Sequence, residues 1–598
     1  MTTLTSKTQQ QRDMLAQWAF DTRPVLGRFH LWLEDVETEW TRGKPEPSQP
    51  SNMSFVPGGI ERQLAMTAAV TALGTRLFGR FGEGEHLSKL ELNEVKKDAD
   101  AVSAYAMSEG LWYLSRHLPE NHAIMVCLGE GLMPKAGETE EMGSNPNLGF
   151  GRVYARPGVS KILDEKVQRL LNDKTYGWTD FYTEIRLAGI TVWGAAIDTL
   201  ENTSRFALGR EEGTMTILHV FDQPLHILRP YEGYMGVLTL PNEVQKKASE
   251  SSILLDYHTP RELVFKAIQD AYPGIKAENI HVWTLTGESR VNRLRALWSS
   301  WESLGVHLVD KNWALPNGAE AFTESGTYSP THSVKTWQDD DGEIHLFLFD
   351  GYAASAEALQ AASLAPVLDL HSSISVFTSK FGLRYETESH IMHLDPDITS
   401  FQNKLEELLG EKVEQNTVDD YKAMICEARE AGLNLDKPAL VADDFFPEKN
   451  WGVLALGSYM GDDPYTGYEG VTKVKEDTYR VTVKLLSRKV EKKVSLTLRF
   501  MDGEKKSRVI FDPLLSRLLD SPNYRDRPVK ISDSGRIRNE LQTLCFEALE
   551  FPSPDRMRVV FSKIPESIFS EPKKKRLAEI LAWYKERHPV WFSWLTLD

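Results

Sequence analysis

An aspartate and a glycine follow one of the most apolar runs in the sequence. Asp350 and Gly351 come directly after IHLFLF at 344–349. An acid at the carboxyl end of a buried parallel strand points into the crevice where open α/β sheets bind ligands. We therefore predict that Asp350 is a general base or a ligand of a divalent cation (Mg²⁺ or Mn²⁺), with Gly351 beside the substrate. The alternative is that Asp350 caps the following helix and Gly351 makes the turn.

A second candidate site for an anion follows the apolar run IHVWTL at 280–285. The next residues are predicted to start a helix, and the unpaired N–H groups of a helix N-terminus attract phosphate or carboxylate. The predicted substrate-binding residues of this turn are Thr286, Gly287, Ser289 and Arg290. The spacing does not match G-x-G-x-x-G, so a dinucleotide cofactor is only weakly indicated. The alternative is a capping motif in which Thr286 or Ser289 satisfies the helix donors.

Two histidines lie among carboxylates in ESHIMHLDPD at 388–397. Imidazole and carboxylate groups bind first-row metals, so His390 and His393 are predicted metal ligands together with Asp350. The spacing is not H-E-x-x-H, and a polar surface is the alternative. The acidic run at 339–341 before Gly342 is instead typical of a hairpin turn, because it lacks the spacing of a calcium loop.

A Gly-rich stretch at 129–158 follows a predicted strand and contains Arg152. Long loops of this kind often close over substrates, so Arg152 is a predicted contact of an anionic substrate. No G-K-S/T follows the glycines, which disfavours an ATPase or kinase of the P-loop class.

The pattern of helices and strands expected along the sequence predicts an α/β fold with four regions, which position these residues. Residues 1–118 form a helical N-terminal region, in which apolar residues up to Trp32 and Leu33 recur at helical spacing. Residues 119–255 are an α/β part with the Gly-rich loop, in which 189–206 predicts a strand, a Gly-Ala turn and a helix. Residues 256–400 alternate strands and helices, which indicates a central, mainly parallel or mixed sheet with flanking helices. Residues 401–598 contain a β-hairpin at 478–500 and closing helices.

Composition narrows the classes of protein. The chain has 598 residues, and 69 basic against 86 acidic residues give a net charge of −17, so we expect no nucleic-acid partner. Three scattered cysteines exclude a Cys-rich zinc module and fit a reducing compartment. No N-terminal signal and no apolar run of membrane-spanning length are visible, so the expected location is the cytoplasm.

These observations lead to two hypotheses from different classes. The first is an enzyme for a small polar, anionic or phosphorylated metabolite, with a metal-assisted lyase, isomerase or hydrolase as candidate reactions. The second is a non-catalytic scaffold or assembly protein. Its interface, also the candidate contact of a homo-oligomer, is the basic and aromatic tail PKKKRLAEILAWYKERHPVWFSWL at 572–595. We expect this tail to dock on the protein's own body unless it serves as that interface, and a membrane is the least expected partner.

Overall fold

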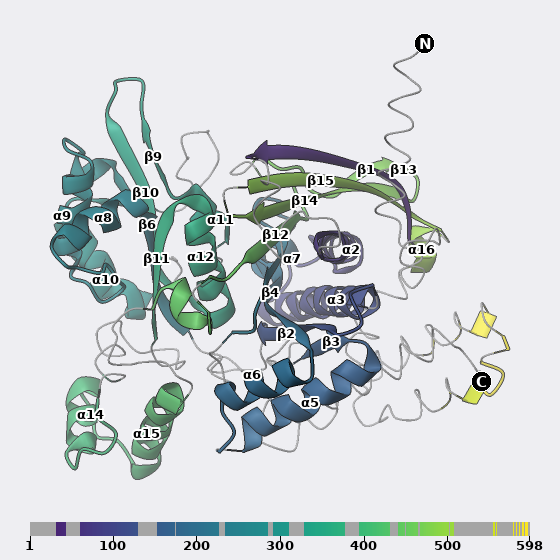
Figure 1. Cartoon of the computed structure of the whole chain (residues 1–598). Coiled ribbons are helices and arrows are strands. Elements are labelled where there is room, and N and C mark those ends of the chain that lie inside the picture. Colours follow the sequence, from purple (N-terminus) through teal and green to yellow (C-terminus); the bar gives the residue numbers. More distant parts are fainter. Residues whose placement is uncertain are drawn as a thin grey trace.

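The computed structural model of the chain describes most of residues 31–507 (Figure 1). The described residues are 31–43, 60–115, 117–129, 152–173, 175–225, 234–284, 291–309, 328–376, 391, 394–430, 440–448, 450–463, 467–488, 490–501 and 503–507, with isolated positions after 553. Within them, no helix is long and apolar enough to cross a membrane.

Among the described residues there are two sheets, and the larger has nine strands drawn from both halves of the chain. Their order is β1-β15-β14-β12-β5-β4-β2-β3, with β13 beside β14, and β2 and β4 pair in parallel while the other neighbours are antiparallel. The strands are β1 (Leu31–Arg42), β2 (His122–Leu128), β3 (Val153–Ala155), β4 (Thr191–Glu201), β5 (Met215–Phe221), β12 (Val453–Tyr459), β13 (Thr472–Lys475), β14 (Thr478–Ser487) and β15 (Val490–Phe500).

Two helices cover one face of this sheet, α2 (Glu61–Phe78) and α3 (Lys89–Ser115) (Figure 1). Helix α2 is rich in Ala and Thr and is buried around most of its circumference, because it packs against both α3 and the strands. Alternate residues of β5, such as Leu218 and Val220, face this layer, while Ile217 and His219 face the opposite side. The opposite side is where the second sheet and its helices are packed.

The second sheet has six strands in the order β11-β6-β10-β7-β8, with β9 beside β10. Strand β7 pairs in parallel with β8 and β10, and the other pairs are antiparallel. The strands are β6 (Tyr234–Pro241), β7 (Ile280–Trp283), β8 (His307–Leu308), β9 (Lys335–Gln338), β10 (Ile344–Ala354) and β11 (Leu370–Val376). The helices around it are α8 (Asn242–Glu250), α9 (Arg261–Ala271), α10 (Val291–Ser303), α11 (Tyr328–Ser333) and α12 (Ser355–Leu368).

Helix α12 lies between the two sheets and joins them into one core (Figure 1). Its Gln360 donates a hydrogen bond to the Ala196 carbonyl of β4 over 3.4 Å, and its apolar residues pack on β6, β10 and β11. Four further helices lie at the periphery. They are α5 (Pro157–Asn172) and α6 (Trp178–Leu187) near β2 and β3, and α14 (Phe401–Leu409) and α15 (Gln415–Glu430).

The predicted α/β class is confirmed, with mixed rather than purely parallel sheets. The hairpin predicted at 478–500 is β14 and β15, and the turn predicted at 339–342 joins β9 to β10. The hairpin pairs with β1 and β12 in the nine-stranded sheet, so strands on both sides of the boundaries at 118 and 400 share one sheet.

Two local predictions were wrong. Trp32 and Leu33 lie in β1, not in a helix, because the segment pairs with β15 over its length and buries alternate residues. The strand β4 runs through Gly194, where a turn was predicted, and only the short helix α7 (Thr203–Ala207) follows it. A Cβ at Gly194 would lie 2.7 Å from the Gln223 carbonyl, so the glycine allows a close approach and makes no turn. Most of the predicted closing helices and aromatic tail lies outside the described residues.

Candidate functional site

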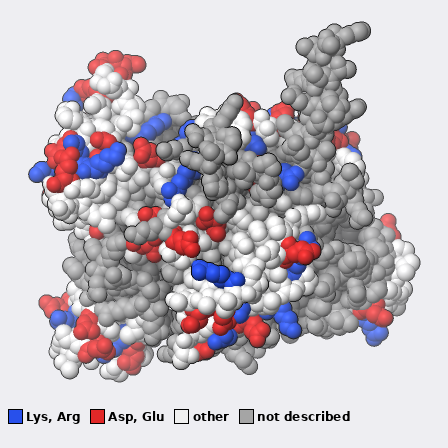
Figure 2. All heavy atoms as spheres, viewed as in Figure 1, with Lys and Arg blue, Asp and Glu red and all other residues white. Residues whose placement is uncertain are grey.

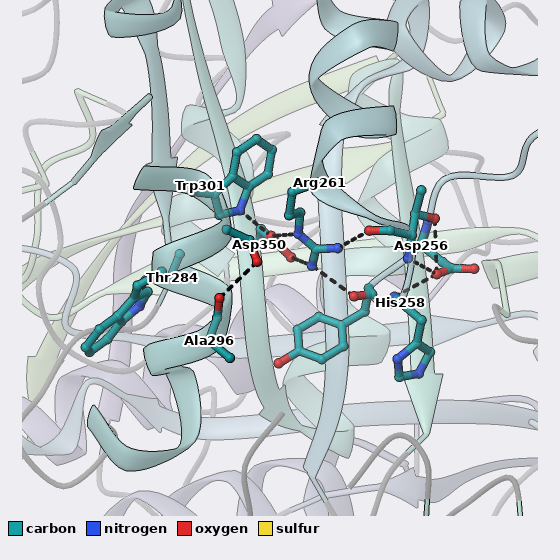
Figure 3. Close-up of polar contacts among 11 residues, drawn as sticks. Asp256, His258, Arg261, Thr284, Ala296, Trp301 and Asp350 are labelled. Carbon is teal, nitrogen blue, oxygen red and sulfur yellow. Dashed lines mark hydrogen bonds and ion pairs between the residues drawn. The ribbon is translucent and has the colours of Figure 1, made fainter. Parts of the chain in front are cut away.

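Asp350 lies in the interior of the six-stranded sheet, with no exposed surface. Arg261 of α9 holds its carboxylate bidentately, through Nε to Oδ2 and NH2 to Oδ1, both at 2.7 Å. Trp301 of α10 donates its indole N–H to Oδ2, also over 2.7 Å (Figure 3). Burial raises the pKa of the Asp350 carboxyl, and the Arg261 charge and these hydrogen bonds oppose that shift.

Arg261 also fastens the loop that precedes its helix. Its guanidinium donates to the carbonyl oxygens of Tyr257, at 2.9 Å, and Thr259. In the same loop, the Asp256 carboxylate accepts the backbone N–H groups of His258 and Thr259 over 2.7 and 2.8 Å (Figure 3). The ion pair therefore ties together β10, the loop before α9, and α10.

The strand does not end at Asp350, as the sequence had suggested, but continues to Ala354. A charged residue can stay inside this buried strand because its charge is paired and hydrogen-bonded. Gly351 lies against β7, where an added Cβ would come within 3.2 Å of the Thr284 carbonyl. These contacts favour a structural role for Asp350, and its predicted catalytic and metal-binding roles stay predictions.

Of the remaining predicted site residues, only Arg152 lies in the part of the chain that the structure describes. Thr286, Gly287, Ser289 and Arg290 fall in the link between β7 and α10, and His390 and His393 follow β11, but all six lie outside the described residues. Arg152 is buried before β3 at the far end of the nine-stranded sheet. Its NH2 group donates to Ser108 over 3.2 Å, and its guanidinium lies 5.4 Å from the Tyr154 ring. The structure thus places Arg152 beside the nine-stranded sheet and Asp350 within the six-stranded sheet.

No group of three or more His, Cys, Asp or Glu side chains is arranged to hold a metal among the residues that the structure describes. A Mg²⁺ or Mn²⁺ ion held by Asp350, His390 and His393 therefore stays a prediction. Both Asp350 oxygens already accept strong hydrogen bonds, so an ion there would have to displace Arg261 or Trp301.

A different set of polar side chains meets where α11 and α12 pack on the nine-stranded sheet. We call it the Tyr328 cluster, and it consists of His219 (β5), Tyr328 and His332 (α11), and Gln360 and Ser363 (α12). The Tyr328 ring centroid lies 5.8 Å from that of His219 and 4.6 Å from that of His332. His219, Tyr328, Gln360 and Ser363 have no exposed surface, and His332 is partly exposed.

Several buried polar atoms of the Tyr328 cluster are left without hydrogen bonds inside the described core. His219 Nε2, Tyr328 Oη, His332 Nε2 and Gln360 Oε1 lack a hydrogen-bond partner in the part of the chain that the structure describes. An unsatisfied buried polar atom costs about 1–3 kcal/mol, and native proteins contain few of them. The Tyr328 cluster therefore concentrates four such atoms in one part of the described core.

Hydrogen bonding assigns the tautomer of His219. Ser363 donates its hydroxyl proton to the backbone carbonyl of Gln360 over 3.0 Å. The Ser363 hydroxyl oxygen lies 2.9 Å from His219 Nδ1. Ser363 has one proton to donate, so His219 Nδ1 carries a hydrogen and Nε2 carries the lone pair. Burial lowers the pKa of His219 to about 3, so the ring is neutral at pH 7.

Charged groups lie close to this cluster. The buried Lys484 of β14 lies 3.7 Å from Glu491 Oε1, which also accepts the Tyr468 hydroxyl over 2.6 Å. Burial lowers the pKa of His332, and the positive charges of Lys484 and Arg42 lower it further. Burial raises the pKa of Tyr328, and the carboxylates of Glu491, Glu201 and Asp463 raise it further, so its hydroxyl stays protonated. Arg42 Nε and NH2 are also buried atoms without a partner among the described residues.

A glycine provides the space in which Tyr328 sits. A Cβ at Gly457 of β12 would lie 3.0 Å from Tyr328 Oη and 2.6 Å from Met215 Cε. The Tyr328 backbone N–H donates to Glu201 Oε1 of β4 over 2.9 Å. The nine-stranded sheet therefore fixes both ends of this residue.

No sequence pattern predicted the Tyr328 cluster, although one signal was present. His219 interrupts the apolar strand run TMTILHVF at 214–221 at a position that faces inward. Tyr328 and His332 lie in TYSPTHS at 327–333, where no pattern indicated a site.

No known protein family matches the sequence, and no curated protein is significantly similar to it.

Proposed function

We propose that the chain is an enzyme that acts on a small polar, anionic metabolite bound at the Tyr328 cluster. The observation that carries this proposal is the group of buried polar atoms on His219, Tyr328 and His332 that lack a partner among the described residues. Binding sites combine apolar walls with a few convergent polar groups, and buried groups with shifted pKa values gather at such sites.

The donors and acceptors suit an anion that also carries a hydroxyl or a carbonyl. Lys484 and Arg42 supply positive charge, and the protonated Tyr328 hydroxyl can donate a hydrogen bond to the ligand. The Nε2 lone pair of His219 can accept a proton from a substrate hydroxyl or carbon acid. An anion beside His219 raises the pKa of the imidazole and makes it a stronger base. Acid–base chemistry of the isomerase or lyase type follows from these roles.

The scaffold hypothesis has less support. Phe592, in the aromatic tail, is fully buried and lies 6.0 Å from Trp594 between ring centroids. With no exposed surface, this ring is not available to a partner. We therefore keep the enzyme as the proposed function, with a cytoplasmic location as part of the same proposal.

The test uses Tyr328→Phe, which removes only the hydroxyl. Thermal unfolding and calorimetry would screen phosphorylated metabolites, hydroxy acids and dicarboxylates, each with and without Mg²⁺ or Mn²⁺. A ligand at 100 times its Kd stabilises the native state by about 2.7 kcal/mol. Loss of a hydrogen bond to a charged ligand, about 1.5–3 kcal/mol, should weaken binding roughly 10- to 150-fold. Without ligand the variant should be as stable as the parent, or more stable.

Tyr176→Phe is the matched control, because its hydroxyl donates to Glu184 over 3.2 Å in the link between α5 and α6, which is not part of the Tyr328 cluster. This variant should bind the ligand as the parent does. The proposal is contradicted if no compound in the panel binds the parent, or if a ligand binds Tyr328→Phe and the parent equally.

A further inference from the structure

Three histidines at the edge of the six-stranded sheet form a continuous hydrogen-bonded chain. His281 Nδ1 lies 2.8 Å from His307 Nδ1, and His281 Nε2 lies 3.0 Å from His345 Nδ1. His345 Nε2 lies 3.1 Å from Asp339 Oδ2 in the β9–β10 turn. We call these four residues the imidazole chain. The two ring nitrogens of His281 point to different partners, so the rings form a line and do not converge on a common centre.

The carboxylate at one end sets the direction of every bond in the chain. Hydrogen bonds from the Glu343 backbone and from His345 lower the pKa of Asp339, so it is ionised and accepts the Nε2 proton of His345. His345 Nδ1 then carries a lone pair and accepts from His281 Nε2. His281 Nδ1 in turn accepts from His307 Nδ1. All three rings are neutral in this arrangement, with one proton in each link.

The middle of the imidazole chain is well covered. Trp337 of β9 stacks on both His281 and His345, with interplanar angles of 17° and 15°. The His307 end is partly exposed, and there the chain supports a very short strand. Strand β8 has two residues, and its backbone contact with β7 includes the Val309 N–H to Val282 carbonyl bond of 2.9 Å.

We propose that the imidazole chain is a pH-sensitive latch that holds edge strand β8 against β7. A proton added to His281 Nδ1 would face the N–H of His307, so the closed chain resists protonation of His281 until the pH is far below the ordinary histidine value. Opening of β8 releases His281 from this link and lets it take up a proton, so acid favours the open state. The His281–His307 link is the weak one, because it lies farthest from the carboxylate. Among the described residues, β8 pairs with β7 at only two positions, so the side-chain link contributes much of what holds it there.

The surroundings of His281 agree with this assignment. Burial lowers the pKa of His281 to about 3, and His307 and His345 contribute to that shift. The charged groups on the adjacent elements are Lys276 and Glu278 at the 3₁₀ turn 277–279, Arg295 and Glu302 on α10, Lys335 on β9, and Asp340, Asp341 and Glu343 in the hairpin turn. Lys276 and Asn279 both donate to Glu343, so this carboxylate is engaged away from the rings. Figure 2 shows the acidic side chains at the hairpin tip, upper left.

Hydrogen exchange of the Val309 amide tests the latch. The rates at pH 7.5 and 5.5 are corrected for intrinsic exchange, and the Leu348 amide in β10 serves as a reference in the same sheet. His307→Asn keeps a donor near the Nδ1 position but cannot titrate in this range. We expect protection of Val309 in the parent to fall at least tenfold at pH 5.5 relative to Leu348. The Asn variant should keep its protection at both pH values.

His86→Asn is the control, because the His86 side chain is 89% exposed and lies outside this sheet. It should behave as the parent does. His307→Ala, which removes the link altogether, should lose protection at both pH values. The proposal is overturned if Val309 stays protected in the parent at pH 5.5, or if His307→Asn loses protection as the parent does.

Discussion

Replacing Asp350 with Asn separates a structural from a catalytic aspartate. Asn has nearly the same shape but one acceptor oxygen, so it can retain only part of the set of three 2.7 Å hydrogen bonds from Arg261 and Trp301. Its amide N–H groups would face the donors of Arg261. The Arg261 side chain is only 2% exposed, so its charge would be left buried and uncompensated.

The cost should be large. Breaking a buried ion pair by removing one partner costs about 3–5 kcal/mol, and the loss of two charge-assisted hydrogen bonds at roughly 1.5–3 kcal/mol each gives the same range. Native-state hydrogen exchange of the β10 amides measures this cost locally, which suits a chain that need not unfold in one step. Exchange should accelerate roughly 150- to 5,000-fold, since 1.36 kcal/mol corresponds to a factor of ten.

Two further variants serve as comparisons for Asp350→Asn. Asp340→Asn, in the exposed hairpin turn, should leave exchange unchanged. Asp350→Asn combined with Arg261→Met removes both charges, and should be destabilised by less than the sum of the single changes. If Asp350→Asn kept its protection yet lost ligand binding or activity, the structural interpretation would be refuted and the predicted catalytic role favoured.

Two further predictions concern pH and glycine. His219 and His281 have pKa values of about 3 in the folded protein, against an ordinary value of 6.5 for histidine, so the unfolded chain binds more protons below pH 6.5 and stability falls as pH drops toward 3. Each should cost about 2 kcal/mol by pH 5 in urea unfolding, and His219→Gln should remove its share. Gly236→Ala places a Cβ 2.3 Å from the Tyr257 ring and should cost about 1–3 kcal/mol, whereas Gly158→Ala in α5 meets nothing within 4 Å and should be neutral or stabilising by the same assay.

Local signals predicted most elements of the six-stranded sheet. Pro260 and Gly274 flank α9, and Gly305 follows α10. These residues mark helix ends near those of Arg261–Ala271 and Val291–Ser303. The acidic Gly turn between two alternating runs predicted the β9–β10 hairpin, which the register confirms. These signals lie within a few residues of the structure they specify.

Pairing between distant segments could not be predicted in the same way. Strand β1 is held by β15, more than 400 residues later, so its helical spacing was overridden by a partner that no local pattern reveals. Asp350 illustrates the same limit. A charge usually marks a strand end, and the strand continues only because Arg261, 89 residues away, pairs with it.

The buried histidines show where sequence reasoning about the site stops. A lone histidine in an apolar strand is more often a satisfied core residue than a functional one, and His371 fits that expectation, because its Nε2 lies 2.9 Å from the Leu255 carbonyl. His219 occupies a similar strand position in the other sheet, but its Nε2 has no partner among the described residues. The sequence alone does not distinguish His219 from His371. The difference arises from Tyr328, which reaches His219 only because Gly457 leaves room above β12, and it is this contact that separates a candidate base from a packed core residue.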